Sequence, residues 1–134
     1  MVITSIEKSA GKGPVWSLTT ELREIADIDS AMMPELLSLF LNDSTTRLEA
    51  LSGACFRGDF KTVRAQAHSL KGSALQMGAA GLASHCAALE LSDRAAPEQY
   101  GPMMRAIGDE FVRVRGAMEE YLINGETAGL QSGS

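Results

Sequence analysis

The sequence has few aromatic residues, few cysteines and no excess of positive charge, and each shortage excludes a class of protein. Phe, Trp and Tyr make up 5% of the 134 residues. Few segments are rich in aromatic and β-branched residues, which favour strands, so a β-rich fold is not expected. The formal net charge is −5. This charge argues against a nucleic acid or an anionic membrane as partner, because both bind basic surfaces.

The two cysteines, Cys55 and Cys86, form no CxxC pair and no disulfide framework, which is typical of a reducing compartment. No apolar run approaches the roughly 18 residues of a membrane span. The first residues also lack the apolar core of a signal peptide. We therefore expect a cytoplasmic protein, unless the chain was cut from a larger one.

Helix-forming residues dominate the composition. The sequence is 45% hydrophobic and contains many Ala, Leu and Met residues. The length suits one domain, which we expect over residues 18–124. We expect residues 1–17 to form a flexible leader and residues 125–134 a flexible tail, because both show no sustained apolar period.

The apolar spacing predicts a short helix over 20–28 and then four long helices separated by recognisable end signals. Ser30 is expected to cap the first long helix, which Gly58 ends; Asp59 caps the next, and Gly78 ends that one. The last two helices are expected over about 79–93 and from Pro97 onward. Short connections make successive helices antiparallel, so we expect an all-α, up-down-up-down four-helix bundle with the short helix as a lid.

His68 lies outside the apolar stripe of the helix over 59–77. At about 100° per residue, this imidazole points roughly 130° away from the centre of the stripe, so we expect it to be exposed. Lys61, Arg64 and Lys71 lie on the same exposed side. These cations would offset the charge of about −2 that a phosphoryl group brings. The rival interpretation is an unimportant histidine on a solvated polar face.

Gly72 and Leu75 indicate that the side of the helix that carries His68 is a contact surface. Glycine within a helix costs about 1 kcal/mol relative to alanine, and we interpret Gly72 as clearance for a partner's backbone, with close packing of helices as the rival. Exposed Leu75 suits docking. Leu36 and Phe40 form a second apolar strip, which either packs the short helix or docks a partner.

A metal site is not expected, because His85 beside Cys86 has no further ligands at short spacing. Cys86 is expected to be a small core residue.

The segment around His68 resembles the signature of histidine phosphotransfer (Hpt) domains. The family pattern is AHxLKGxA followed by a glycine, and this sequence matches it at the following positions: Ala67, His68, Leu70, Lys71, Gly72, Ala74 and Gly78. Residues 34–40, the turn at 58–60 and the stretch 86–90 are also similar to the family. The resemblance covers about residues 20–123.

The resemblance implies a phosphocarrier of two-component phosphorelays. His68 would accept a phosphoryl group from a receiver-domain aspartate and pass it to another receiver, with Lys71 balancing the phosphate and Gly72 giving the receiver room. Gln76 would help to orient the ring. The protein would be neither ATPase nor autokinase, and it would need no cofactor, because the receiver supplies Mg²⁺. Its expected partners are receiver domains and a histidine or hybrid kinase.

Two alternatives remain open at this point. The chain could be an Hpt domain excised from a hybrid or chemotaxis-type kinase, with the same chemistry at His68. It could also be an adaptor that docks receivers without phosphorylation, although such an adaptor would not need the histidine.

Overall fold

The computed structural model describes residues 15–92 and 97–124, which form five helices. In chain order these are α2 (Thr20–Ile28), α3 (Met32–Arg57), α4 (Phe60–Gln76), α5 (Ala80–Leu91) and α6 (Pro97–Asn124). The expected tail, the first 14 residues of the expected leader and the predicted end of the fourth helix at Asp93 lie outside the described residues. The all-helical fold expected from the sequence is confirmed.

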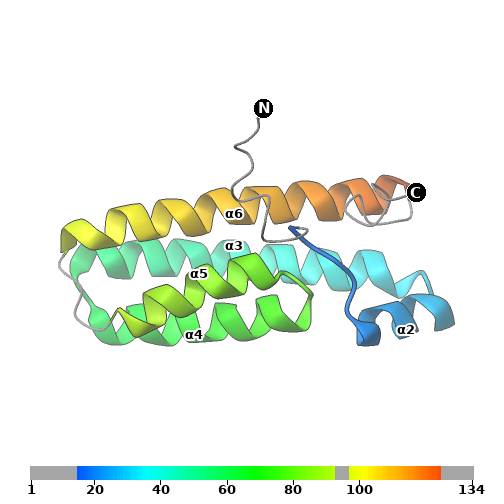
Figure 1. The fold of residues 1–134 in the computed structure, drawn as a ribbon, viewed down its shortest axis with the longest axis horizontal. Helices are drawn as coiled ribbons and strands as arrows, with labels where there is room; N and C mark the ends of the chain where they lie inside the picture. The colour runs from blue at the N-terminus through cyan, green and yellow to red at the C-terminus, as the bar shows by residue number, and fades with distance from the viewer. Residues whose placement is uncertain (1–14, 93–96, 125–134) are drawn as a thin grey trace, which may run out of the picture.

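The four long helices form a bundle, in which α3 packs against α4, α4 against α5, α5 against α6, and α6 against α3 (Figure 1). The short helix α2 lies beside the N-terminal part of α3. The most extensive contact joins α4 to α5. Small side chains on their buried faces, among them Ala67, Ala74 and Cys86, allow these two helices to approach closely.

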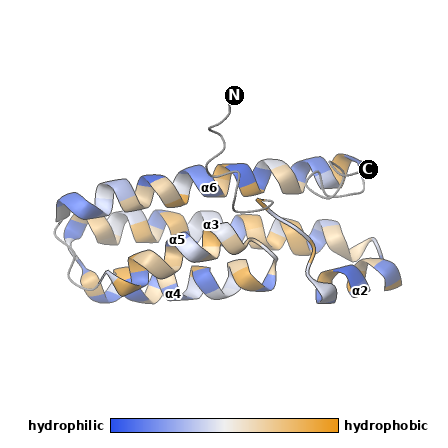
Figure 2. Ribbon diagram, viewed as in Figure 1, coloured by the Kyte–Doolittle hydropathy of each residue, from blue (hydrophilic) through white to orange (hydrophobic). Residues whose placement is uncertain are grey.

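The core is built from the stripes that the sequence predicts. On α6 the buried residues follow alternating steps of three and four: Ile107, Phe111, Val114, Met118 and Tyr121. Figure 2 shows hydrophobic and hydrophilic residues alternating along α3, α4 and α6, whereas α5 is mainly hydrophobic. Amphipathic helices of this kind are stabilised mostly by burying their apolar faces against one another.

The helix ends on either side of α4 follow local sequence signals. Gly58 ends α3 in the left-handed conformation, with φ of 71°, and its N–H donates to the carbonyl of Cys55. The carboxylate of Asp59 then accepts a hydrogen bond of 3.2 Å from the N–H of Thr62 in the first turn of α4. These two signals fix where α4 begins.

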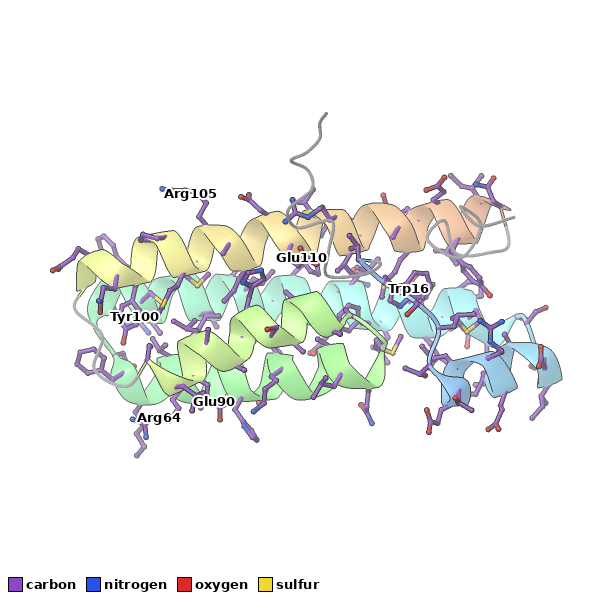
Figure 3. The ribbon with its side chains drawn as sticks, in the orientation of Figure 1. Trp16, Arg64, Glu90, Tyr100, Arg105 and Glu110 are labelled. Atoms are coloured by element: carbon purple, nitrogen blue, oxygen red, sulfur yellow. The ribbon has the colours of Figure 1, made fainter. Side chains whose placement is uncertain are left out.

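Two details of the N-terminal region differ from the prediction. Ala31, not Ser30, precedes α3, and its N–H is held by the Asp29 carboxylate at 3.1 Å. Residues 15–17, expected in the flexible leader, pack against the bundle instead. Trp16, labelled in Figure 3, is 1% exposed. Its indole N–H donates to the carbonyl of Met77, and its ring meets that of Tyr121 edge-on. A large aromatic side chain buries too much apolar surface to remain in a flexible segment.

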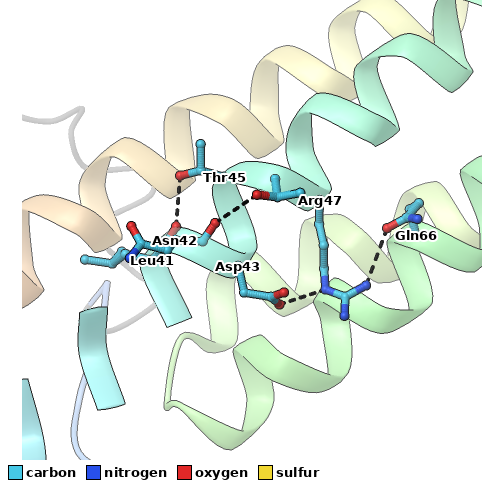
Figure 4. Close-up of polar contacts among 7 residues, drawn as sticks. Leu41, Asn42, Asp43, Thr45, Arg47 and Gln66 are labelled. Carbon is cyan, nitrogen blue, oxygen red and sulfur yellow. Dashed lines mark hydrogen bonds and ion pairs between the residues drawn. The ribbon is translucent and has the colours of Figure 1, made fainter. Parts of the chain in front are cut away.

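Polar contacts tie α3 to α4 and to α6. Arg47 pairs with Asp43 on its own helix at 2.8 Å and reaches Gln66 of α4 at 3.5 Å (Figure 4). On the other side of α3, Thr45 accepts a hydrogen bond of 3.0 Å from Arg115 of α6. Within the described ranges, none of the helices is long and apolar enough to cross a membrane.

We predict that Gly78→Ala destabilises the protein more than Gly58→Ala. Both glycines have positive φ, at 85° and 71°, and a side chain there costs about 1–2 kcal/mol. A Cβ at Gly78 would also collide with the carbonyl oxygen of Ser17, whereas one at Gly58 would meet nothing within 4 Å. Urea unfolding of both variants measures the difference. Equal losses would mean that the contact between residue 17 and the turn is not maintained in solution.

Candidate functional site

The antiparallel pair of α4 and α5 brings His68 and Glu90 together. The two residues lie at similar distances in sequence on either side of the turn at Gly78, so the returning helix passes beside the imidazole. In Figure 3, Glu90 lies on the side of the bundle where α5 runs along α4, with Arg64 nearby. The site is therefore built on two packed helices and on no loop, which fixes its geometry.

One carboxylate bridges two side chains of α4. His68 Nδ1 lies 2.8 Å from Glu90 Oε2, and Lys71 Nζ lies 2.8 Å from Glu90 Oε1. The side chain of His68 is 67% exposed, whereas those of Lys71 and Glu90 are 29% and 19% exposed. The imidazole thus projects into solvent, while its Nδ1 atom is held by a partly buried carboxylate.

The hydrogen bonds from Lys71 and then from His68 lower the pKa of Glu90 below its ordinary value of 4.5. The carboxylate is therefore ionised at neutral pH, and an ionised carboxylate can only accept hydrogen bonds. In the neutral ring, the proton must then sit on Nδ1 and be donated to Glu90. This leaves the lone pair on Nε2, the nitrogen away from Glu90.

The surface around the ring combines positive charge with open space. Arg64 and Gly72 lie one turn before and after His68 and are exposed. A Cβ at Gly72 would meet nothing within 4 Å, so packing within the protein does not require a glycine there. Leu75 is 56% exposed on the same side of α4, and Lys61 is exposed two turns before the histidine.

Three residues singled out by the sequence do not belong to this cluster. Phe40 is 5% exposed in the core and is not available for docking, and Leu36 is partly buried against the same core. Their strip on α3 therefore contributes to packing of the core. Gln76 lies eight residues after His68, about 12 Å along the axis, too far to orient the ring.

Glu90, whose carboxylate contacts the imidazole, is not distinguished by the helical pattern of the sequence. Its apolar neighbour Leu89 marks the buried face of α5, but the helical pattern does not say which residue of α4 it meets. The available signal was the turn at Gly78, since residues at similar distances on either side of a turn, ten for His68 and twelve for Glu90, come close together in an antiparallel helix pair.

Two other titratable candidates, His85 and Cys86, lie on α5, and Cys86 is close enough to Glu90 and Lys71 for their charges to affect the pKa of its thiol. His85 is exposed. Cys86 is fully buried, and desolvation raises the pKa of its thiol to about 12, so it behaves as a core residue. Among the described residues, no three His, Cys, Asp or Glu side chains gather closely enough to hold a metal ion.

A hollow next to the site lies between the start of α4 and the end of α5. Its walls include Phe60, Arg64, Glu90 and Tyr100, and its cavity volume is about 10 Å³. Sites for small molecules usually enclose about 300–1,000 Å³. The hollow is therefore small for a nucleotide, and the chemistry available here is that of an exposed nucleophile.

The comparisons with known proteins agree with this geometry. The family model of the Hpt domain matches residues 35–121. Among solved structures, histidine-containing phosphotransfer protein B (HptB) from Pseudomonas aeruginosa PAO1 is similar, with 34% sequence identity and a TM-score of 0.68 over 77% of this chain and 91% of that chain. None of the curated proteins matches.

The chain belongs to the Hpt domain family. Proteins of this class are phosphocarriers of phosphorelays and interact with kinases and receiver domains.

We predict that the stabilising effect of Glu90 depends on pH. Because its pKa is lower in the folded protein than its ordinary 4.5, the unfolded chain takes up the proton first as the pH falls. The stabilisation is complete above about pH 4.5 and is lost as the pH falls through the lower, folded value. Glu90→Gln should therefore lower the free energy of unfolding at about pH 7, and the difference from wild type should shrink toward about pH 3.

Urea unfolding at several pH values measures this difference. Glu119→Gln, at an exposed position of α6, is the matched control and should show a smaller change. A Glu90→Gln deficit that stays constant down to about pH 3 would contradict the assignment of the lowered pKa.

Proposed function

We propose that His68 accepts a phosphoryl group on Nε2 from the aspartyl phosphate of one receiver domain and donates it to the aspartate of another. The observation that carries this proposal is the exposed ring with Nδ1 held at 2.8 Å from Glu90. An imidazole that is fixed through one nitrogen and open at the other is suited to act as a nucleophile without rearrangement.

Positive charge near the ring supports the phosphorylated state. A phosphoryl group adds a charge of about −2. Lys71 is within reach through its flexible stem, and Arg64 lies one turn away along α4. Lys61 lies further off and would act at longer range. These cations offset part of the added charge in a protein whose net charge is −5.

The open side of α4 supports docking of a receiver. The absence of a side chain at Gly72 lets a partner's backbone approach the helix next to His68, and Leu75 offers an apolar contact one turn further on. The receiver would contribute its acidic pocket and Mg²⁺. In this proposal the protein uses no ATP and acts in the cytoplasm, where its kinase and receiver partners meet.

We predict that His68→Gln abolishes phosphoryl acceptance and leaves folding intact. An exposed substitution changes the free energy of unfolding by no more than about 0.5 kcal/mol, while the nucleophile is lost. The measurement is labelling by a phosphorylated receiver, with the label expected to be acid-labile and alkali-stable. His85→Gln removes the other of the two histidines and should label normally; a labelled His68→Gln protein would refute the assignment.

We predict that Gly72→Gln and Lys71→Ala fail in different ways. Gly72→Gln should keep or raise helix stability, because glutamine is a better helix former by somewhat under 1 kcal/mol, yet it should block docking and transfer. Lys71→Ala should still dock, but the rate and the equilibrium of transfer should change by about 0.2–1 kcal/mol, the range typical of a screened ion pair. Calorimetric binding of a receiver beside a transfer time course separates the two. Wild-type binding and transfer by Gly72→Gln would contradict the clearance argument.

A further inference from the structure

We infer that the exposed side of α6 is a self-association surface, on which a second copy of this chain docks its own α6 in the antiparallel direction. The two copies are related by a two-fold axis that passes beside Val112. The surface lies away from His68, so this inference goes beyond the function proposed above and does not depend on it.

A continuous stripe of α6 faces away from the bundle. Its members recur every three or four residues: Gly101, Arg105, Gly108, Val112, Gly116, Glu119 and Ile123. At about 100° per residue, they fall within an arc of roughly 80°, centred about 130° from the buried stripe of the same helix. Val112 is 63% exposed and Ile123 is 82% exposed. In Figure 3, Arg105 projects from α6 on one side of the molecule, while Arg64 and Glu90 lie on the opposite side.

The stripe is complementary to itself when its direction is reversed. Counted outward from Val112, the seventh residue is Arg105 in one direction and Glu119 in the other. An antiparallel copy therefore places Arg105 of each chain opposite Glu119 of the other, and Val112 opposite its own counterpart. Because a two-fold interface uses the same patch on both copies, each of these charge pairs occurs twice.

The two charges of the stripe are not engaged within the protein. Arg105 and Glu119 are exposed, and neither forms an ion pair with another residue that the structure describes. By contrast, Arg113 on another side of α6 pairs with Glu110 at 3.0 Å. A second copy supplies the opposite charge to both. This pairing orients two chains whose net charge of −5 otherwise makes them repel.

Two glycines allow the helices of the two copies to approach closely. A Cβ at Gly108 or Gly116 would meet nothing within 4 Å, so packing inside the protein explains neither residue. Each costs about 1 kcal/mol of helix stability relative to alanine. In the antiparallel pair they lie on either side of Val112, where the absence of side chains shortens the distance between the helix axes.

Phe56 of α3 extends the apolar part of this surface. It is 93% exposed and lies three turns after Thr45, on the same side of α3. Since Thr45 bonds to Arg115, the antiparallel register puts Phe56 about one turn from the level of Gly101. The two-fold axis brings Ile123 of the second copy to that same level. Association therefore covers two strongly exposed apolar side chains, and it does so twice.

Sedimentation velocity of the full chain at increasing protein concentration tests the association. We expect the wild type to pass reversibly from monomer to dimer. Val112→Glu sets two carboxylates against each other at the axis and should stay monomeric, while circular dichroism shows the same helix content because the position is exposed. A wild-type protein that remains monomeric, or a Val112→Glu protein that still dimerises, would overturn the inference.

Charge reversals test the antiparallel register. Arg105→Glu and Glu119→Arg each place like charges opposite one another twice in the dimer, so each should raise the dissociation constant by about tenfold or more. Mixed in equal amounts, the two variants regain both attractive pairs and should form a heterodimer about as stable as the wild-type dimer. Glu24→Arg, at an exposed position of α2, changes the net charge as Glu119→Arg does and should associate like the wild type. A mixture that does not recover would refute this register.

Phosphoryl acceptance distinguishes a second copy from a receiver as the occupant of the stripe. The dimer leaves the His68 side of both copies open, so Val112→Glu should be labelled by a phosphorylated receiver at the wild-type rate. Slower labelling would place the stripe in the receiver contact and overturn its assignment to a second copy. Because dilution dissociates the dimer, unfolding of the Glu119→Gln control is measured in dilute protein.

Discussion

The close contact between α4 and α5 is the constraint on which the site depends. His68 and Lys71 belong to α4 and Glu90 to α5, so their 2.8 Å contacts exist only in one register of the two helices. The turn at Gly78 sets that register, and the segment at Trp16 braces the turn by bonding to Met77 and packing on Tyr121 of α6. A helix hairpin held at its turn and along its length fixes the position of His68 relative to Glu90.

The side chains of His68, Lys71 and Glu90 differ in exposure in the way that the proposed phosphoryl transfer requires. The carboxylate of Glu90 is largely shielded, which strengthens its hydrogen bonds, and its partners lower its pKa so that it stays an acceptor. The imidazole is mostly exposed, so a large partner can reach it. Lys71 lies between these extremes and is paired with Glu90, and in the proposed phosphorylated state it would respond to the charge added on the ring.

Local signals made much of the fold predictable from the sequence, while contacts between distant segments escaped it. The bounds of α2, the cap at Asp59 and the glycine turns depend on neighbouring residues, as does the outward direction of His68 on one helix. Burial of Trp16 and Phe40 depends on what other segments cover them, and the pairing of Glu90 with His68 depends on the register of two helices. The apolar spacing within one helix does not show which segments cover a side chain or how two helices are aligned.

The charge distribution adds a final constraint on how a partner can approach. The protein carries a net charge of −5, yet Lys61, Arg64 and Lys71 all lie on the His68 side of α4. An acidic partner is therefore repelled by the molecule as a whole and attracted only over a small area, which favours productive orientation over tight binding. Since a phosphocarrier must release each receiver after transfer, weak binding with strong orientation suits the task better than high affinity.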